Sequence, residues 1–597
     1  MLAADEALAD ARLIGDLAVS AFFKGDSARA RERARHELQG KVERWLQTGE
    51  GHDELHGLAE ELREGAHPVE SFHWEIEFPE VFERTDPGFD ALVGNPPFLG
   101  GTLVGAQLGL PYHDYLVANF PPATGLADIV AFFLRRAYDL VRRGATLGII
   151  ATNTVAQGDT RSTGLEQVLQ NGGSLYHAQR RYQWPGNAAV VVSLLHIVKT
   201  ERAVHPLLDA VHVDRISAYL LAGAVDSTPV TLSENKGVCF RGTKVWGSGF
   251  VFEDPPSNGS SSLAELQRLL LLEPRNREVL FAYLGGEDFN SSPTQRPSRF
   301  VIDFGNMSEE QARHWPALFS IVEERVRPVR LRNKQRNYRE NWWLHANRVD
   351  DSGPYLEQHG RVLALTCVSQ HVALAFVGRG TIIQDRMILF LLHQDADFAV
   401  VQSRVHEAWV RMVGTTLGDA LSYTTTCFDT FPRPHEVDRA ELQGTGARYY
   451  SFRARIMETN NEGLTSTYNR FHDPEEAPAE IIRLRELHAA MDRAVLDAYG
   501  WTDIPTECHF LLDYEDEGDG QDEGRASRRS KPWRYRWPDQ VRDEVLARLL
   551  KLNRQRAEEE RLSGALSGAS AQRRARRSRR HTGTGTLDMF GTDDEGG

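Results

Sequence analysis

Residues 95–98, Asn-Pro-Pro-Phe, combine groups that could grip and stack a flat amine. The side-chain oxygen of Asn95 and the carbonyl of Pro96 are two acceptors, while Pro96 and Pro97 hold the chain rigid and bring no competing N–H. Phe98 adds a ring for stacking. Two acceptors on an aromatic amine favour the pyramidal geometry that frees its lone pair. The motif therefore indicates attack of an amine on an electrophilic carbon; a strand-ending turn is the alternative interpretation.

The elements around this loop predict a βαβ unit. FDALVG (89–94) is a short apolar strand that ends at the loop. Residues 127–144 show helical spacing of apolar residues, with Gly144 as the expected C-cap. Residues 145–154 form a continuous apolar run, as expected for a strand buried on both faces of a parallel sheet. The loop thus follows the first strand of the unit.

The same alternation continues down the chain. Residues 165–173 indicate a short helix, and residues 174–181 and 187–199 indicate two more strands. Residues 69–200 are therefore predicted to form half of a doubly wound α/β domain, in which ligands bind at the carboxyl ends of the strands. The Asn95 loop lies at such an end.

The flanking regions complete an α/β chain of several domains. Residues 1–68 are predicted to be helical, residues 201–450 to be mixed α/β, and residues 451–512 to be helical. Residues 513–597 are predicted to contain a charged linker, a helix over 541–562 and a disordered tail. No run approaches the ~20 apolar residues of a membrane span, and no signal peptide is recognisable, so the cytoplasm is the expected location.

Cysteine spacing and charge limit the classes of function. The four cysteines lie far apart with no CxxC pair, which indicates reduced, structural thiols and no metal site. The net charge of −15 is uneven, because residues 325–348 interleave cations with Tyr338, Trp342 and Trp343. This segment is predicted to bind DNA phosphates, a solvated helix face being the alternative. Its cations are Arg325, Arg327, Arg330, Arg332, Lys334, Arg336 and Arg339.

Several segments resemble one family. FDALVGNPPF resembles the catalytic motif of class I methyltransferases that act on N6 of adenine, and residues 127–154 resemble the helix and strand that follow it. Three downstream stretches, YLGGEDFNSSPTQRPSRFVIDF, TTTCFDTFPRP and residues 471–501, resemble the target-recognition and helical regions of MmeI-like (type IIG) restriction-modification methyltransferases. The resemblance, with the gamma order of motifs, covers roughly residues 70 to 545. It implies a partial class I (Rossmann-like) sheet followed by an α+β recognition region and helical segments.

The resemblance also implies roles for individual residues. Asn95 and Pro96 would hold the N6 amine of an extruded adenine, Phe98 would stack on it, and Trp184 with Pro185 would line the pocket of the target base. Asp128 falls near the motif beside the cofactor, S-adenosylmethionine; an ordinary charge at a helix N-terminus is the alternative. The expected substrate is double-stranded DNA in a restriction-modification or phage-defence system.

One expected feature is missing upstream of the loop. The family binds S-adenosylmethionine through a glycine-rich F-x-G-x-G loop, which residues 1–88 do not contain. We expect a split or truncated methyltransferase that needs a separate polypeptide with the cofactor-binding half, whose absence would leave a strand edge exposed. The alternatives are a non-catalytic DNA-binding specificity protein with a relic pocket and a methyltransferase of a protein amide. No PD…(D/E)xK constellation precedes the loop, so we expect no DNA cleavage by this chain.

Overall fold

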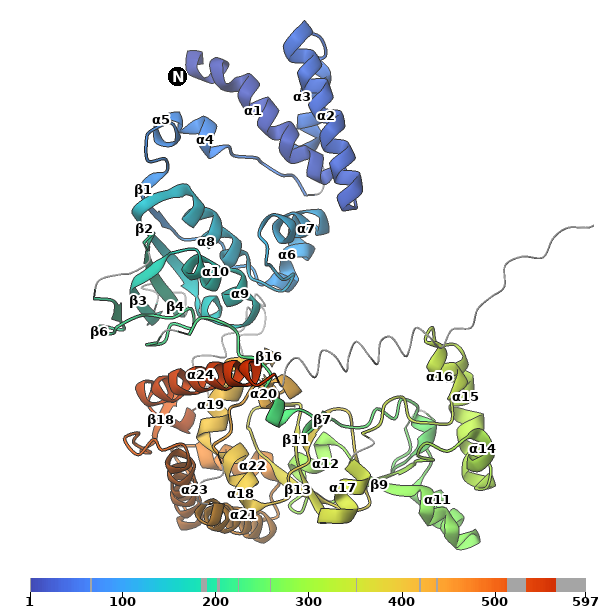
Figure 1. Ribbon diagram of the computed structural model, residues 1–597. Helices are drawn as coiled ribbons and strands as arrows, with labels where there is room; N and C mark the ends of the chain where they lie inside the picture. The colour runs from blue at the N-terminus through green and yellow to red at the C-terminus, as the bar shows by residue number, and fades with distance from the viewer. Residues whose placement is uncertain are drawn as a thin grey trace, which may run out of the picture. The chain divides into compact units, whose positions relative to one another are not determined.

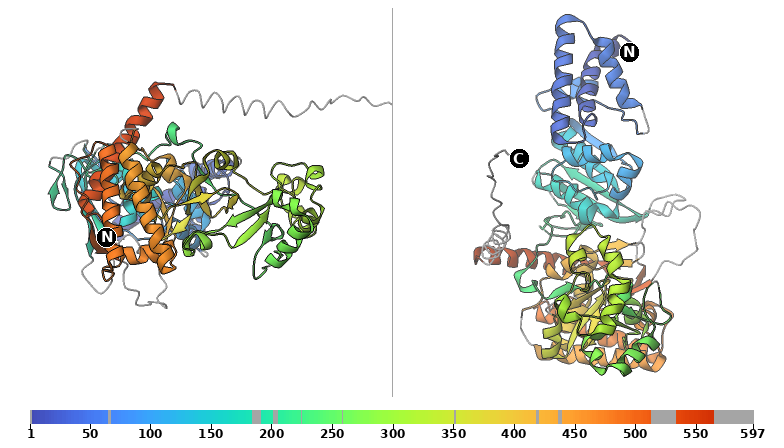
Figure 2. Two further views of the ribbon diagram at one scale, coloured as in Figure 1. Left: turned by 90° about the horizontal axis from the view of Figure 1, so that it is seen from below. Right: turned by 90° about the vertical axis from the view of Figure 1, so that its right-hand side faces the viewer.

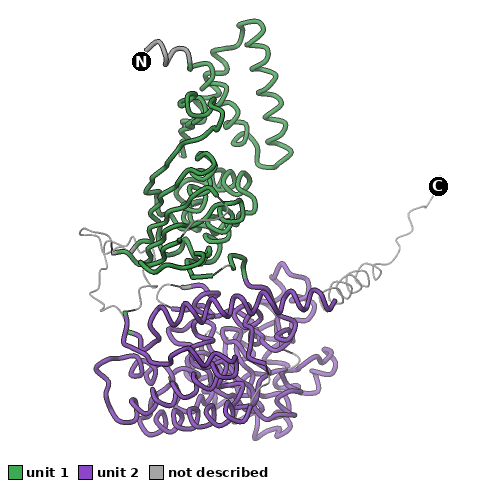
Figure 3. The backbone as a smooth tube through the Cα atoms, turned by 60° about the vertical axis from the view of Figure 1, so that its left-hand side comes forward, with its two compact units in different colours: residues 1–228, 512–533 green, residues 229–511, 534–597 purple. Residues whose placement is uncertain are grey.

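The computed structural model describes residues 2–64, 67–183, 191–200, 205–223, 225–257, 259–349, 352–417, 420–435, 439–512 and 533–564. Contacts divide the chain into two compact units, residues 1–228 with 512–533 and residues 229–511 with 534–597 (Figure 3). Each unit has hydrophobic clusters of its own. Within the described residues, no helix is long and apolar enough to cross a lipid bilayer.

The first unit contains a helical segment and a sheet with its covering helices (Figure 1). In chain order its elements are α1 (Leu2–Phe23), α2 (Ala28–Thr48), α3 (His52–Arg63), α4 (Trp74–Glu77), α5 (Pro79–Phe82), β1 (Phe89–Gly94), α6 (Gly101–Gln107), α7 (Leu110–Asn119), α8 (Ile129–Leu140), β2 (Val141–Thr152), α9 (Gly158–Thr163), α10 (Leu165–Gln170), β3 (Ser174–Gln183), β4 (Val191–Val198), β5 (Leu207–Leu208) and β6 (Val211–His212).

The N-terminal helices α1, α2 and α3 run side by side (Figures 1 and 2). Their apolar positions meet in one cluster that includes Leu17, Leu38 and Leu55. The prediction of a helical N-terminal segment is thus confirmed as far as Arg63. Gly49 ends α2 with a φ of +74°, and Gly51 precedes α3 with a φ of +91°, conformations that favour glycine.

The sheet of this unit has the strand order β1-β2-β4-β3-β5-β6. β1 and β2 are parallel and joined through α8, which confirms the predicted βαβ unit. β4 is antiparallel to both β2 and β3, so the sheet is mixed. β1 pairs only with β2 among the described strands and therefore lies at an edge.

Two details of this unit differ from the sequence-based expectation. α8 ends at Leu140 and β2 begins directly at the buried Val141, so Gly144 lies inside the strand, with a φ of +72°, and is no helix cap. β2 is also not buried on both faces. Alternate residues from Ala145 to Ala151 are buried in the cluster under α8 and α10, while Thr146, Gly148 and Ile150 are only half-buried.

The described part of the chain from residue 229 on contains four small sheets with helices around them. Their strand orders are β14-β9-β10-β8, β13-β11-β15-β7, β12-β17-β16 and β18-β19. In chain order the elements from residue 229 on are β7 (Cys239–Arg241), β8 (Val251–Phe252), α11 (Leu263–Leu272), β9 (Leu280–Leu284), α12 (Gly286–Ser291), β10 (Arg299–Ile302), α13 (Glu309–Ala312), α14 (Pro316–Arg325), α15 (Arg327–Leu331), α16 (Arg336–Glu340), α17 (Ser352–His359), β11 (Arg361–Thr366), β12 (Val368–Ser369), β13 (Ala375–Gly378), β14 (Thr381–Ile383), β15 (Met387–Phe390), α18 (Asp395–Gln402), α19 (Arg404–Val413), β16 (Thr415–Leu417), β17 (Ala420–Ser422), α20 (Thr425–Asp429), α21 (Arg439–Asn460), α22 (Leu464–His472), α23 (Ala479–Ala498), β18 (His509–Leu512), β19 (Trp533–Arg536) and α24 (Asp539–Leu562).

The helical part of this unit corrects one predicted boundary. α21 is continuous across residues 450 and 451, and it packs against both α18 and α23. A domain boundary at that point would cut a buried helix in two, so the α+β region and the helical region form one body. The linker at 513–532 and the predicted disordered tail from residue 565 lie outside the described residues.

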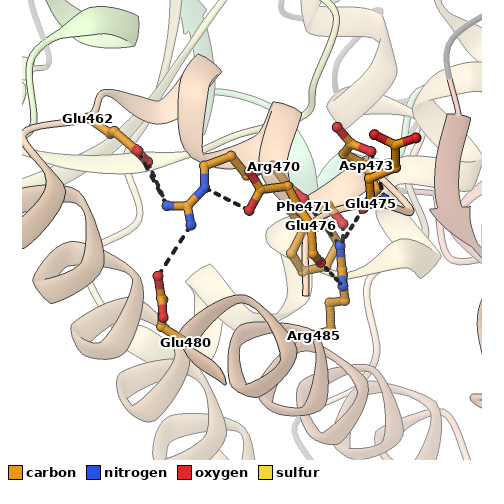
Figure 4. A network of polar contacts seen from close by, with 8 residues as sticks. All are labelled: Glu462, Arg470, Phe471, Asp473, Glu475, Glu476, Glu480 and Arg485. Carbon is orange, nitrogen blue, oxygen red and sulfur yellow. Dashed lines mark hydrogen bonds and ion pairs between the residues drawn. The ribbon is translucent and has the colours of Figure 1, made fainter. Parts of the chain in front are cut away.

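Two arginines fix the turn between α22 and α23 (Figure 4). Arg470 forms ion pairs of 3.1–3.2 Å with Glu462, Glu476 and Glu480. Arg485 donates to four backbone carbonyls of the same turn, at distances of 2.9–3.1 Å. Because guanidinium groups present several fixed donors, two side chains can hold a turn whose carbonyls would otherwise lack partners.

Candidate functional site

The Asn95 loop lies at the carboxyl end of the edge strand β1. The parallel register places Gly94 beside Ile149, so the loop begins where β2 also nears its end. Asn95 and Pro97 are exposed, Pro96 is buried and Phe98 is half-buried. A buried proline thus anchors the loop while the side chain of Asn95 stays accessible to a ligand.

Asp128 ties the end of this loop to the start of α8. Its Oδ1 accepts from the backbone N–H of Val130 at 2.9 Å, as an N-cap, and from the N–H of Leu99 at 3.4 Å. The carbonyl of Leu99 in turn accepts from the N–H of Ile129 at 3.1 Å. Asp128 is therefore the charge at a helix N-terminus that the sequence left as the alternative, and its role in cofactor binding stays a prediction.

Thr160 belongs to the same arrangement, although no sequence pattern singled it out. Its Oγ1 accepts from the backbone N–H of Asp128 at 3.0 Å. Thr160 on α9 therefore fixes the position of Asp128, which in turn fixes the end of the loop. The local signal for Asp128 was present, since an aspartate directly before an apolar helical run is a common N-cap pattern. A contact over 32 residues, like that of Thr160, has no local signal.

Gly101, just after the loop, sits against the backbone of Leu126. A Cβ at Gly101 would lie 2.3 Å from the carbonyl carbon and oxygen of Leu126, so the backbone would have to move. We expect Gly101→Ala to lower the thermal stability of the first unit and to displace the loop, whereas Gly57→Ala, where a Cβ meets nothing within 4 Å, should be neutral or stabilising. Thermal unfolding and limited proteolysis of both variants would check this; equal stability would contradict it.

The remaining residues of the predicted base pocket cannot be placed. Trp184 and Pro185 lie outside the described residues. β3, which leads to them, ends at Gln183 opposite Val191, while Val192 is opposite Thr152 at the end of β2. The carboxyl ends of β1 and β3 therefore lie at the same end of the sheet. The role of Trp184 and Pro185 in the base pocket stays a prediction.

The edge and one face of the sheet around the loop are open. Val93, on β1, is 86% exposed beside Gly148. On the same face His177 and His196 stack on neighbouring strands, with their Nδ1 atoms 3.2 Å apart. Burial, and then the neighbouring His177, lowers the pKa of His196 below its usual value. α8 and α10 cover only the opposite face.

The residues before β1 do not fit S-adenosylmethionine. Within the described part of residues 1–88, every element that precedes β1 is a helix. The one Gly-x-Gly pair there, Gly49 and Gly51, joins α2 to α3 and so follows no strand. A nucleotide-type cradle needs a glycine-rich turn between a strand and a helix, which these residues do not form.

The basic segment is less available for DNA than its composition indicates. Arg330 is 1% exposed and donates to the carbonyls of Val245 and Trp246, and burial lowers its pKa to about 10. Arg325 donates to the carbonyl of Ser260 and the hydroxyl of Ser261. For Arg330 the prediction of a phosphate contact is wrong, because the side chain is buried and its donors hold the fold together. Arg325 is exposed and uses one terminal nitrogen for its bonds, so its phosphate contact stays a prediction.

The aromatic residues of this segment are also structural. Trp342 and Trp343 are 4% and 8% exposed and pack in the hydrophobic cluster of the unit, so they offer no stacking surface. Tyr338 contacts Trp246 with ring centroids 5.0 Å apart. Three other cations are already engaged or paired: Arg339 with backbone carbonyls, and Arg327 and Arg336 with glutamates. Arg332 and Lys334 are exposed and form no ion pair with a described residue.

A part of each unit matches the model of a known protein family. Residues 27–174, which contain β1 and the Asn95 loop, match the Eco57I restriction-modification methylase model. Residues 256–435 match the target recognition domain of MmeI. The chain thus contains one segment similar to a restriction-modification methylase and one similar to the MmeI target recognition domain. The resemblance that the motifs indicated is confirmed, and so is the mixed α/β class of the fold.

One solved structure shares the fold of this chain. The type IIL restriction-modification enzyme MmeI in complex with DNA matches with a TM-score of 0.53 and 19% identity, over 82% of this chain and 60% of that chain. The type IIG restriction endonuclease BpuSI matches with a TM-score of 0.27 and 10% identity, over 69% of this chain and 54% of that one. This chain thus covers 60% of the length of the MmeI chain. No curated protein matches the chain significantly.

Proposed function

We propose that the chain is the target-binding and base-holding part of a site-specific DNA methyltransferase that modifies N6 of adenine in a restriction-modification system. The exposed Asn95 at the carboxyl end of β1, within a loop that Asp128 and Gly101 hold in place, is the observation that carries this proposal. The matches to a methylase and to a target recognition domain support DNA as the substrate.

The chemistry of the loop suits an extruded adenine. A stacked base cannot present its amine to a pocket, so the base must leave the duplex at a cost of a few kcal/mol. Stacking on Phe98 would offset about 1–3 kcal/mol of that cost. The Asn95 oxygen and the Pro96 carbonyl would then accept hydrogen bonds from the N6 amine and favour its reactive geometry.

The open edge of the sheet supports the proposal that a second polypeptide binds there and carries the cofactor. β1 is unpaired on one side, and Val93 exposes apolar surface next to it. Unpaired strand edges and exposed apolar faces are usually covered by another segment. We infer that a separate polypeptide with a glycine-rich loop adds strands beyond β1 and brings S-adenosylmethionine, the methyl donor.

A methyl-transfer assay tests this proposal. The purified chain, alone and with a candidate glycine-rich partner, is incubated with unmethylated genomic DNA and labelled S-adenosylmethionine, and the DNA is digested to nucleosides. We expect N6-methyladenine only when the partner is present. Label in cytosine would refute the assignment of adenine, and tight cofactor binding by the chain alone would refute the need for a partner.

A non-catalytic DNA-binding protein is the second candidate, because the described residues supply no cofactor cradle. The same preparation distinguishes the two. Sequence-specific DNA binding without methyl transfer, with every candidate partner, would favour the binding protein.

A further inference from the structure

A polar cleft of about 760 Å³ lies in the second unit. Segments far apart in the sequence form it: Arg241 at the end of β7, residues 384–386 between β14 and β15, residues 461–466 at the start of α22 and just before it, and part of α12. Arg241 and residues 461–466 lie outside the part that matches the MmeI recognition domain. The cleft is thus a feature of the assembled unit and not of the matched domain alone.

Two exposed arginines are the cations that line the cleft. Arg241 donates through Nε to the carbonyl of Asp385 at 2.6 Å, which holds its guanidinium at the cleft. The backbone carbonyl of Arg386 accepts from the N–H of Cys367 at 2.9 Å, so Arg386 also extends from a fixed backbone. Neither arginine forms an ion pair with a residue that the structure describes. Both therefore keep donors for a ligand.

The network of Figure 4 holds Glu462, a carboxylate that lines the cleft. Gly463 lies against α12 so closely that a Cβ there would be 2.2 Å from the carbonyl oxygen of Asn290. Glu462 directly precedes Gly463. Arg470 forms ion pairs with Glu462 and with Glu476 and Glu480 of the following turn. The Glu462 carboxylate is thus held in an ion pair with Arg470, which it shares with Glu476 and Glu480.

The other lining groups are mostly neutral donors. They include the amides of Asn290, Gln384 and Asn461 and the hydroxyls of Thr465 and Ser466. No aromatic residue lines the cleft, in contrast to the apolar and aromatic lining of most small-molecule sites. Arginine, serine, threonine, asparagine and glutamine are the side chains that most often contact the DNA backbone. The donor set therefore fits phosphates better than a small apolar ligand.

We propose that this cleft binds the sugar–phosphate backbone of the DNA, with Arg386 and Arg241 contacting phosphates. The inference rests on the proposed function in one respect, namely that DNA is the substrate. It replaces the contact that the buried Arg330 cannot make. Glu287 at the start of α12 is the one lining carboxylate without an ion pair among the described residues, and beside a phosphate it opposes binding.

Binding of a fluorescein-labelled random-sequence duplex over a series of salt concentrations tests the cleft. We expect Arg386→Ala to weaken binding about 5- to 10-fold at about 0.1 M salt and to reduce the slope of log K against log salt by about 1. Glu287→Gln should tighten binding. The matched control is Arg268→Ala, an exposed arginine of the same unit that pairs with Glu265. It should leave both quantities unchanged.

The possible results separate this inference from the proposed function. If the wild-type chain binds the duplex and Arg386→Ala binds with the same affinity and slope, the cleft proposal fails and the proposed function stands. If Arg386→Ala or Glu287→Gln changes the preferred DNA sequence without changing the salt slope, the cleft contacts base edges and the backbone proposal is overturned. If the wild-type chain binds no DNA at all, both are overturned.

Discussion

Replacing Asn95 with alanine should lower the rate of methyl transfer to DNA by about 10²- to 10³-fold, with little change in DNA affinity. The exposed amide is one of two acceptors proposed for the adenine amine, and the other, the Pro96 carbonyl, belongs to the backbone and remains. The loss concerns a contact that strengthens as the amine becomes pyramidal, so it should reduce kcat more than it raises KM. The rate is measured with the partner-supplemented preparation, and affinity by titration of DNA.

An asparagine elsewhere in the same unit provides the control. Asn119, at the end of α7, donates only to the carbonyl of Tyr115 one turn earlier, and Asn119→Ala should leave the rate unchanged. The role of Asn95 would be disproved by a variant that keeps the wild-type rate, or by one that loses DNA affinity and rate in equal measure.

Replacing Asp492 with alanine should destabilise the second unit by about 3–5 kcal/mol. Asp492 is fully buried on α23, where its Oδ1 accepts from the backbone N–H of Arg404 at 2.8 Å and its Oδ2 accepts from the Arg404 guanidinium at 2.6 Å. Its Oδ2 also lies 3.1 Å from Nδ1 of His488. Without the carboxylate, the buried cation of Arg404 loses its partner, and an uncompensated buried charge is costly.

Asp497 on the same helix is the matched control. Its ion pair with Arg493 is 2.9 Å long but half-exposed, so Asp497→Ala should cost no more than about 1 kcal/mol. Urea unfolding followed by tryptophan fluorescence compares the variants, since most tryptophans lie after residue 229. A loss below 1 kcal/mol for Asp492→Ala would show that the surrounding structure relaxes around Arg404.

Several elements of the first unit could be predicted because their signals are local. Alternating strand and helix periodicity located β1, α8, β2, β3 and β4, and the Asn-Pro-Pro-Phe loop was found directly after its strand. The boundaries were less predictable. The end of α8 was missed because a valine at position 141 is compatible with both a helix and a strand, and the choice depended on its pairing with β1.

The availability of charged side chains could not be predicted. In the sequence, Arg325, Arg330 and Arg332 look alike. In the structure, Arg325 and Arg330 donate to carbonyls of residues about 65 to 85 positions away. The composition of a segment gives the number of its cations. Only the structure shows which of these side chains a phosphate can reach. The cleft had no sequence signal at all, because Arg241 and Arg386 are single residues in unrelated stretches.

By itself, then, the sequence determined the strand, helix and loop that carry Asn95, since these follow from the periodicity and backbone preferences of neighbouring residues. The tertiary structure alone decided which face of the sheet is open, which arginines are free, and that α21 joins two regions into one body. These properties depend on contacts between residues distant in the chain, and no pattern of neighbouring residues encodes such contacts.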